Sequence, residues 1–176
     1  MMKIGLISDT HGYINTRLIK FFEYVDEIWH AGDIGSIEVF DKLQKIKSVK
    51  AVYGNIDNYK IRQCTNEFEI FSVAQQNIWM THIGGYPGNY APTIKKKLQH
   101  SHPDIIISGH SHILKVIYDK KHQLLHLNPG AAGPIGIHKV STAIRFDINN
   151  KGISNLEILE FPRAIRSESF LPIKTN

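Results

Sequence analysis

The stretch Lys3-Ile4-Gly5-Leu6-Ile7-Ser8-Asp9-Thr10-His11 opens the chain with a short apolar run that ends on a carboxylate and an imidazole. Such a run is typical of a buried strand, and the polar residues then lie at the strand's carboxyl end. In open α/β sheets, sites form at these strand ends. Residues two apart in an extended chain point to the same side, so Asp9 and His11 can face one ligand. Taken alone, the triplet is also explained by a turn-capping aspartate beside a surface histidine.

The next residues continue a strand–helix–strand–helix–strand series, which is typical of a parallel sheet. Helices are expected from Asn15 or Thr16 to about Val25 and, capped by Ser36, to about Ile46, because apolar residues recur at helical spacing. Strands are expected over residues 27–31 and 49–53.

The second half of the chain favours more strands. They are expected over residues 68–73, 78–81, 105–108, 115–119, 124–127, 142–148 and 153–159, with a helix near 92–100. The first two of these strands are expected to form a hairpin around residues 75–77. We expect one domain over residues 1–160 and a loosely held C-terminal tail over residues 161–176.

Composition narrows the class of protein. The chain has 176 residues, 42% of them hydrophobic, and a single cysteine, Cys64, which excludes an intrachain disulfide. Neither a signal peptide nor an 18-residue apolar span is apparent, so we expect a soluble, cytoplasmic protein without a membrane partner. The net charge of +5 allows an anionic partner, yet the Lys95-Lys96-Lys97 run lacks interleaved aromatic residues. Binding of nucleic acid is therefore a lower-ranked alternative, and self-association is left open.

Polar side chains that can hold metal ions follow five of the predicted strands. They are Asp9 and His11, Asp33, Asn55, His82, and the pair His110 and His112. The set combines oxygen donors and imidazoles without a thiolate. Seven donors exceed one tetrahedral site and suit two adjacent metal ions. One carboxylate can bridge two ions that lie about 3.5–4 Å apart.

Each motif also has an ordinary explanation when taken singly. Gly32-Asp33 is compatible with a plain strand-to-helix turn, and Gly54-Asn55 with an Asx turn. The Gly109-His110-Ser111-His112 segment is the most informative, because two imidazoles at this spacing after a strand are seldom a packing solution.

In five ordered motifs the chain resembles the calcineurin-like metallophosphoesterases, in particular their small single-domain bacterial and archaeal phosphodiesterases. The motifs are Asp9-x-His11, Gly32-Asp33, Gly54-Asn55-x-Asp57, His82 and Gly109-His110-x-His112. The resemblance spans about Met2 to Leu159, and the Asn128-Pro129-Gly130 segment resembles a loop of the same branch. It implies a four-layer α-β-β-α sandwich with two mixed β-sheets.

The resemblance also implies roles for the polar residues. Asp9, His11 and His112 would hold a first metal ion, and Asn55, His82 and His110 a second, with Asp33 bridging both. Asp33, Asn55 and His112 are the residues expected to be catalytic.

Two positions depart from the common pattern of the superfamily. Many members carry a histidine directly after the motif asparagine as a proton donor, and this chain has Ile56 there. Related members often have a second histidine two places beyond the metal-binding one, where this chain has Gly84. Other histidines are expected at the surface or behind the ligands, with His138 considered for substrate contact. They are His30, His100, His102, His122, His126 and His138.

The expected function is hydrolysis of a small-molecule phosphodiester, with monoesters second, by a metal-bridging hydroxide. Mn²⁺ is the first choice of metal because the donors are oxygen and nitrogen, with Fe, Zn, Co or Ni as alternatives. The runner-up is a protein-binding scaffold of the same fold, similar to the metallophosphoesterase-like subunit of the retromer sorting complex. The seven intact candidate ligands favour the enzyme.

Overall fold

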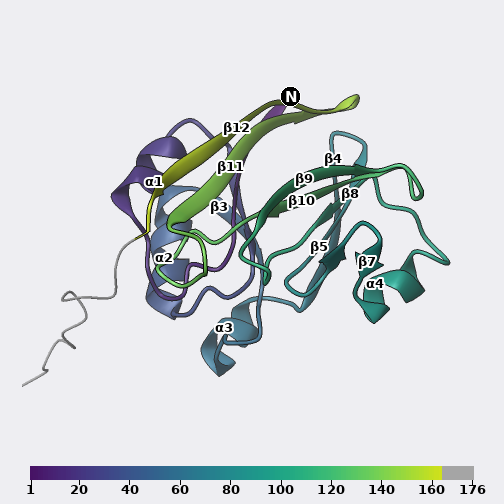
Figure 1. The fold of residues 1–176 in the computed structure, drawn as a ribbon. Helices are drawn as coiled ribbons and strands as arrows, with labels where there is room; N and C mark the ends of the chain where they lie inside the picture. The colour runs from purple at the N-terminus through teal and green to yellow at the C-terminus, as the bar shows by residue number, and fades with distance from the viewer. Residues whose placement is uncertain (164–176) are drawn as a thin grey trace, which may run out of the picture.

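The computed structural model describes residues 1–163, and its strands form two five-stranded sheets and one two-stranded ribbon (Figure 1). The first sheet, in the order β12-β11-β1-β2-β3, contains β1 (Met2–Ile7), β2 (Glu27–Ala31), β3 (Ser48–Val52), β11 (Val140–Asn149) and β12 (Gly152–Pro162). The second, in the order β4-β5-β8-β10-β9, contains β4 (Phe68–Val73), β5 (Gln76–Thr81), β8 (Ile105–Ile107), β9 (Leu114–Asp119) and β10 (Leu124–Pro129). The ribbon pairs β6 (Gly85–Tyr86) with β7 (Asn89–Tyr90). Both large sheets mix parallel and antiparallel pairs, as expected.

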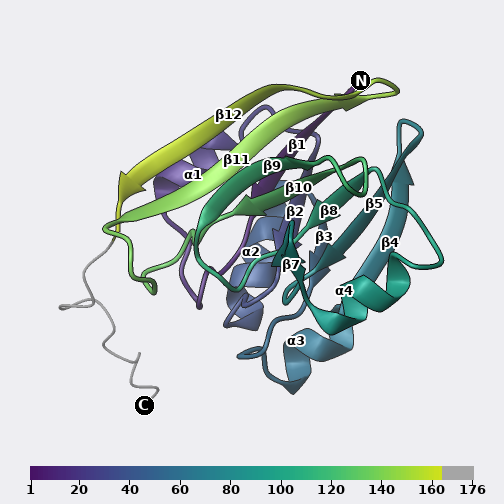
Figure 2. The ribbon, with the colours of Figure 1, turned by 45° about the vertical axis from the view of Figure 1, so that its right-hand side comes forward.

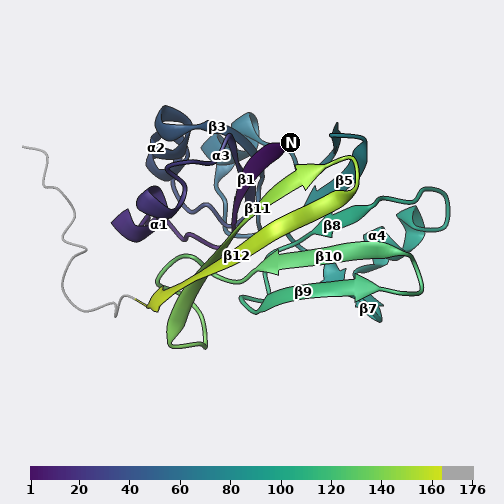
Figure 3. The ribbon, with the colours of Figure 1, turned by 90° about the horizontal axis from the view of Figure 1, so that it is seen from above.

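The four described helices are α1 (Thr16–Phe21), α2 (Ile37–Ile46), α3 (Tyr59–Cys64) and α4 (Pro92–Lys97). Three of them lie on the outer sides of the two sheets, and α3 lies below the sheets at one end (Figures 1 and 3). Figure 1 shows α1 and α2 beyond the first sheet and α4 beyond the second, with the sheets facing each other between them. The α/β four-layer sandwich with two mixed sheets is confirmed.

Three apolar layers hold this arrangement together. Alternate residues of the central strands face opposite sides, so that Leu6 and Trp29 pack between the sheets while Ile7 and Ile28 pack under α1 and α2. On the far side of the second sheet, Ile94 of α4 packs against that sheet's outer face. Central strands buried on both faces read as continuous apolar runs, which is why the sequence signalled them clearly.

The first helix is shorter than its apolar spacing predicts. Asn15 caps α1 through its side chain, as expected, but the helix ends at Phe21 instead of near Val25. Glu23 and Val25 then donate to carbonyl groups only three residues back, which tightens the chain into turns. These turns bring Asp26 to Lys3 of β1, where the Asp26 N–H donates to the Lys3 carbonyl, so sheet pairing overrides the helical pattern.

Three local features differ from the sequence-based expectation. Helix α3, which Asn58 caps, has a single buried residue, Ile61, so it has no apolar period to detect. The ribbon β6–β7 lies in a glycine-rich segment between β5 and α4, for which the sequence predicted no strand. The β4–β5 hairpin turns at Ala74-Gln75, not at 75–77, and both residues have positive φ without being glycine or asparagine.

The end of the chain bears on the expected domain boundary. Strand β12 runs to Pro162, so the last strand extends two residues past the expected boundary at 160. From residue 164 onward the expected tail lies outside the described residues. No helix within residues 1–163 is long and apolar enough to cross a membrane.

Candidate metal centre

The candidate ligands all follow strands whose carboxyl ends meet between the two sheets. Asp9 and His11 follow β1, Asp33 follows β2 and Asn55 follows β3, and these three strands are parallel. From the second sheet, His82 follows β5, and His110 and His112 follow β8, which is parallel to β5. Parallel strands end at the same edge, so the two sheets together bring the seven predicted residues to one place.

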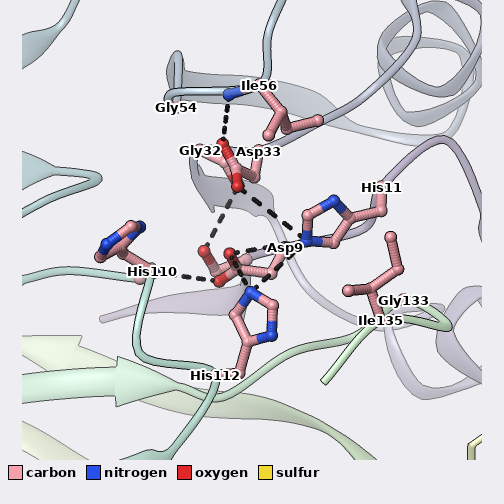
Figure 4. Close-up of polar contacts among 12 residues, drawn as sticks. Asp9, His11, Gly32, Asp33, Gly54, Ile56, His110, His112, Gly133 and Ile135 are labelled. Carbon is pink, nitrogen blue, oxygen red and sulfur yellow. Dashed lines mark hydrogen bonds and ion pairs between the residues drawn. The ribbon is translucent and has the colours of Figure 1, made fainter. Parts of the chain in front are cut away.

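Four of these side chains form the tightest group (Figure 4). Asp9, His11, Asp33 and His112 each offer an atom, and these atoms lie within 4.8 Å of one another. His112 Nε2 is 3.0 Å from Asp9 Oδ1, and His11 Nε2 is 3.9 Å from Asp33 Oδ2. The two imidazoles meet edge to face with their Nε2 atoms 3.4 Å apart. The group is able to hold a metal ion.

The other three residues lie on the second-sheet side of Asp33. His82 Nε2 is 3.3 Å from Asp33 Oδ1 and 3.1 Å from Asn55 Oδ1. The His110 ring lies edge to face against the His82 ring, with 5.1 Å between the ring centres. Asp33 therefore lies between two groups of donors, which is the place the resemblance gives it.

A buried carboxylate oxygen that accepts no hydrogen bond indicates that a cation can bind here. Asp9 Oδ1 is buried and accepts no hydrogen bond within residues 1–163, although His112 Nε2 lies 3.0 Å from it and the Nε2 atoms of His11 and His82 lie 4.0 Å from it. A buried carboxylate oxygen that accepts no hydrogen bond is costly. A divalent cation among these oxygen and nitrogen atoms would satisfy it, and the residues therefore fit a metal ion.

The backbone at the site is held in an uncommon conformation. Five of the seven candidate ligands have positive φ, and none of these five is glycine or asparagine: Asp9, His11, Asp33, His110 and His112. Such residues concentrate at functional sites, where the surrounding structure holds the strain. Aspartate and histidine adopt positive φ more often than most other residues, but the residue type alone does not predict it at a given position.

Two glycines let the strand ends approach the ligands closely. A Cβ at Gly54 would collide with the carboxylate of Asp33, and a Cβ at Gly109 would collide with Ser8 Oγ and lie 3.0 Å from Asp9 Oδ2. Neither glycine has a positive φ, so the requirement at both positions is space and not backbone freedom.

Asp57 has a positioning role that the sequence motif did not reveal. Its buried carboxylate accepts hydrogen bonds from the N–H groups of Ile34, Gly35 and Gly54 at 2.7–3.1 Å. It thus ties the loop after β2 to the loop after β3. Asn128, near the end of β10, acts similarly, because its amide donates to the Gly109 carbonyl at 2.8 Å. In both cases the sequence showed the motif but not the partner.

The titration of the site follows from burial and from the two carboxylates. Burial lowers the pKa of His11, against the opposing charges of Asp33 and Asp9. Burial raises the pKa of Asp33, but the hydrogen bond and charge of His82 outweigh this, so its pKa is lowered. Burial lowers the pKa of His82, but the Asp33 hydrogen bond and the Asp9 charge outweigh it, so its pKa is raised. The pKa values of Asp33 and His82 thus move in opposite directions, because each group stabilises the charged form of the other.

The remaining histidines lie apart from the candidate ligands. His30 is fully buried behind the site, where Thr10 Oγ1 lies 2.9 Å from its Nε2. His126 is buried in the second sheet, with its Nε2 3.1 Å from Ser108 Oγ. His122 is half-buried, and the exposed ones are His100, His102 and His138.

Comparisons with known proteins agree with this geometry. Residues 2–151 match the family model described as the calcineurin-like phosphoesterase superfamily domain. A probable metallophosphoesterase of Methanocaldococcus jannaschii is 32% identical over 136 residues, which cover 74% of this chain and 68% of the relative. A phosphodiesterase of the same organism is 24% identical over 73% of this chain and 83% of its own.

Solved structures share the fold. An archaeal phosphodiesterase superposes with a TM-score of 0.71 at 22% identity, covering 92% of this chain and 99% of the other. Wild-type Vps29 of Entamoeba histolytica complexed with zinc superposes with a TM-score of 0.69 at 20% identity, covering 93% of this chain and 100% of the other.

Proposed function

The chain belongs to the calcineurin-like phosphoesterase superfamily, and on that premise we propose that it hydrolyses phosphodiesters with two divalent metal ions bound between its sheets. Its family and its candidate metal site support a metallophosphoesterase in general. The phosphodiesterase among its relatives favours diesters over monoesters. We take the catalytic domain to span residues 1–160.

The convergence of the ligands on the orphaned oxygen of Asp9 carries the proposal. In it, Asp9, His11 and His112 hold one metal ion, and Asn55, His82 and His110 hold the other. Asp33 lies 3.9 Å from His11 and 3.3 Å from His82, so it would help to hold both metal ions. Mn²⁺ suits these oxygen and nitrogen donors, with Fe, Zn, Co or Ni as alternatives.

The chain orients these ligands before any metal arrives. The Ile56 N–H donates to Asp33 Oδ1 at 3.1 Å, and the His110 N–H donates to Asp9 Oδ2 at 3.2 Å, so each carboxylate keeps one orientation. His82 Nδ1 donates to the Ala31 carbonyl at 2.8 Å, which places its proton on Nδ1 and leaves Nε2 for a metal. When bound, divalent cations supply the charge that acidifies a water molecule and neutralises phosphoryl oxygens. Preorganised ligands avoid the cost of reorganisation during the reaction.

The test combines metal analysis with turnover. Purified protein should bind two equivalents of metal and hydrolyse bis(p-nitrophenyl) phosphate with at least one of the cations named above. Asp33→Asn should lower both metal occupancy and turnover, because an amide offers one neutral oxygen and bridges poorly. Asp41→Asn removes the same charge from the exposed surface of α2 and serves as the matched control. Wild-type turnover in Asp33→Asn would refute the bridging role.

A protein-binding scaffold is the second candidate, because the fold is also that of Vps29. Likeness at 20% identity shows the fold alone. Protein that binds no metal and stays inactive with every cation would favour the scaffold. Binding of a random oligonucleotide that weakens with salt, again without turnover, would favour a nucleic-acid binder instead.

A further inference from the structure

A cavity of about 590 Å³ opens directly beside the candidate metal centre. Asn55 and His82 line the cavity and also belong to the candidate centre, so the cavity adjoins it. The cavity lies between the segment from β3 through α3 to β4 and the segment from β5 to α4 (Figure 2). Its volume is within the usual range of small-molecule sites. It is large enough for a substituent much bigger than the reacting phosphate.

Two cations line this cavity, and each lies over an aromatic ring. The guanidinium carbon of Arg62 is 4.5 Å from the ring centre of Tyr53, and Lys97 Nζ is 4.7 Å from that of Phe68. Within residues 1–163 the ion pairs of lysine and arginine are Lys50–Glu27 and Arg145–Glu157, so neither Arg62 nor Lys97 is paired with a carboxylate. Both cations are therefore free to meet an anion.

The charge balance of the cavity is positive. Glu67 is its one lining carboxylate among the described residues, and it accepts a hydrogen bond from the Tyr53 hydroxyl at 3.4 Å. Arg62 and Lys97 together outweigh it by one charge. A substrate that enters from the metal centre thus meets surplus positive charge some distance from the reacting group.

Arg62 is held with one flat face toward Tyr53. Its Nε donates to the Asp57 carbonyl at 2.8 Å and its Nη2 to the Gly54 carbonyl at 3.3 Å, which fixes the plane of the guanidinium. In residues 1–163 its Nη1 donates no hydrogen bond. A fixed guanidinium plane stacks on flat rings and binds phosphate well. The adjoining wall is apolar, because Ile83 and Pro92 line it.

We propose that this cavity binds a nucleotide-like substituent of the substrate, that is, a flat ring together with a second phosphate. The ring would lie against Arg62 and the apolar wall, and the second phosphate would meet Lys97 and Arg62. The inference rests on the proposed function, because it names the class of diester that the metal centre would cleave. The reacting phosphate would then lie next to Asn55 and His82.

Binding without metal tests the cavity by itself. Thymidine 3′,5′-bisphosphate is titrated calorimetrically into the full chain in excess chelator. The wild-type protein should bind it. The dissociation constant of Lys97→Met should be about fivefold to tenfold higher, because one charge-assisted contact is lost. Methionine keeps the apolar contact with Phe68. Lys95→Met, on the same helix but outside the cavity, is the matched control and should change the constant by less than about twofold.

A second ligand tests the ring. Deoxyribose 3,5-bisphosphate, which lacks the base, should bind the wild-type protein about tenfold more weakly, because stacking of the base is lost. Equal binding of the two bisphosphates would overturn the assignment of a flat ring. No binding of either, or equal binding to the wild type and Lys97→Met, would overturn the cavity as a phosphate site.

Turnover separates this inference from the proposed function. The hydrolysis of thymidine 5′-(p-nitrophenyl phosphate) is compared with that of the same compound carrying a 3′-phosphate, both at saturating metal. Both compounds release p-nitrophenolate, so the leaving group is constant. The 3′-phosphate should lower KM with little change in kcat, and Lys97→Met should abolish this advantage. Turnover with equal KM values would contradict the cavity assignment and leave the phosphodiesterase standing. Metal-free binding without turnover of either compound would support the cavity and contradict the phosphodiesterase.

Discussion

At the scale of a single residue, Ile56 would limit which leaving groups the proposed phosphodiesterase can expel. Its backbone N–H orients Asp33, while its side chain, 47% exposed, stands where many superfamily members are expected to carry a proton-donating histidine. A hydrocarbon cannot protonate a leaving oxygen. Aryl oxides leave as stabilised anions, whereas alkyl oxides need a proton. General acid catalysis typically contributes about 10²–10⁴-fold.

We therefore predict a steep dependence of rate on the leaving group. Turnover of aryl phosphodiesters should exceed that of alkyl ones by about 10²-fold or more, and rates should fall as leaving-group pKa rises. Ile56→His should flatten this slope if its imidazole reaches the leaving oxygen. The measurement is a series of rates against leaving-group pKa with metal saturating.

The control for this series is a histidine placed elsewhere. Ile70→His introduces an imidazole at a similarly exposed position on β4, 59% exposed, and should leave the slope unchanged. A flat series in the wild-type protein would mean that another acid is present or that chemistry is not rate-limiting. Either result would contradict the prediction that Ile56 restricts the leaving groups.

At the residue scale, the sequence predicted which residue types lie at the candidate site but not their backbone conformations. The order of motifs identified Asp9, Asp33 and the histidines, since acidic and imidazole side chains after strands have a chemical reason to be there. The positive φ of the candidate ligands accompanies contacts with other loops, since the Asp9 and His11 N–H groups donate to carbonyl groups of the loop after β2. Asp57 shows the same limit, because its partners Ile34 and Gly35 lie more than 20 residues away in the chain.

At the scale of elements, the loops that leave the strands need to pass very close to the ligands. Gly109 separates β8 from His110, and a Cβ there would meet Ser8 and the Ala31 carbonyl as well as Asp9. We predict that Gly109→Ala lowers metal affinity by about tenfold or more, because the added Cβ displaces Asp9, which is itself a candidate ligand. The metal-free protein should lose only about 1–2 kcal/mol of unfolding free energy.

Metal titration and chemical denaturation of the same variant measure these two effects. Gly88→Ala is the comparison, because its Cβ would meet nothing within 4 Å while its φ of +88° makes a side chain strained. That variant should lose stability without losing metal affinity. Unchanged metal affinity in Gly109→Ala would count against the need for a close approach.

Elements were predictable where one chain segment decides its own structure. Strand β2 has the predicted bounds, and α2 begins after its predicted cap, Ser36, because apolar spacing and capping agree there. Helix α3 escaped prediction because six residues with one buried side chain give no period. Helix α1 was predicted too long because the return of the chain to β1 stops it.

At the scale of the whole molecule, the facing of the two sheets creates the site. Ligands from β1 and β5 meet although more than 70 residues separate Asp9 from His82. The apolar runs predicted buried strands, but their division into two mixed sheets came only through the family resemblance. The cavity beside α4 has no sequence motif, since Arg62 and Lys97 become neighbours of Asn55 and His82 only after folding.

Two neutral histidines inside the sandwich couple global stability to pH. Burial lowers the pKa of His126 to about 4, helped by the charge of Lys115, and burial lowers the pKa of His30 to about 4 as well. In the unfolded chain a histidine titrates near 6.5. Between these two pH values the unfolded state binds more protons than the folded state, so acidification destabilises the fold.

We predict that the titration of His126 alone lowers the unfolding free energy of the metal-free protein by about 2 kcal/mol between pH 7 and pH 5. Well below pH 4 both states are protonated at this residue, and its contribution no longer changes. His126→Gln, which can still bond Ser108, should be less sensitive to acid by that amount, while His30 keeps part of the slope. His102→Gln, at an exposed position, should retain the full wild-type dependence. Denaturant unfolding in chelator across this pH range measures how the unfolding free energy of each variant changes with pH. An identical pH dependence in His126→Gln and the wild type would show that the buried imidazole is not neutral in the folded state.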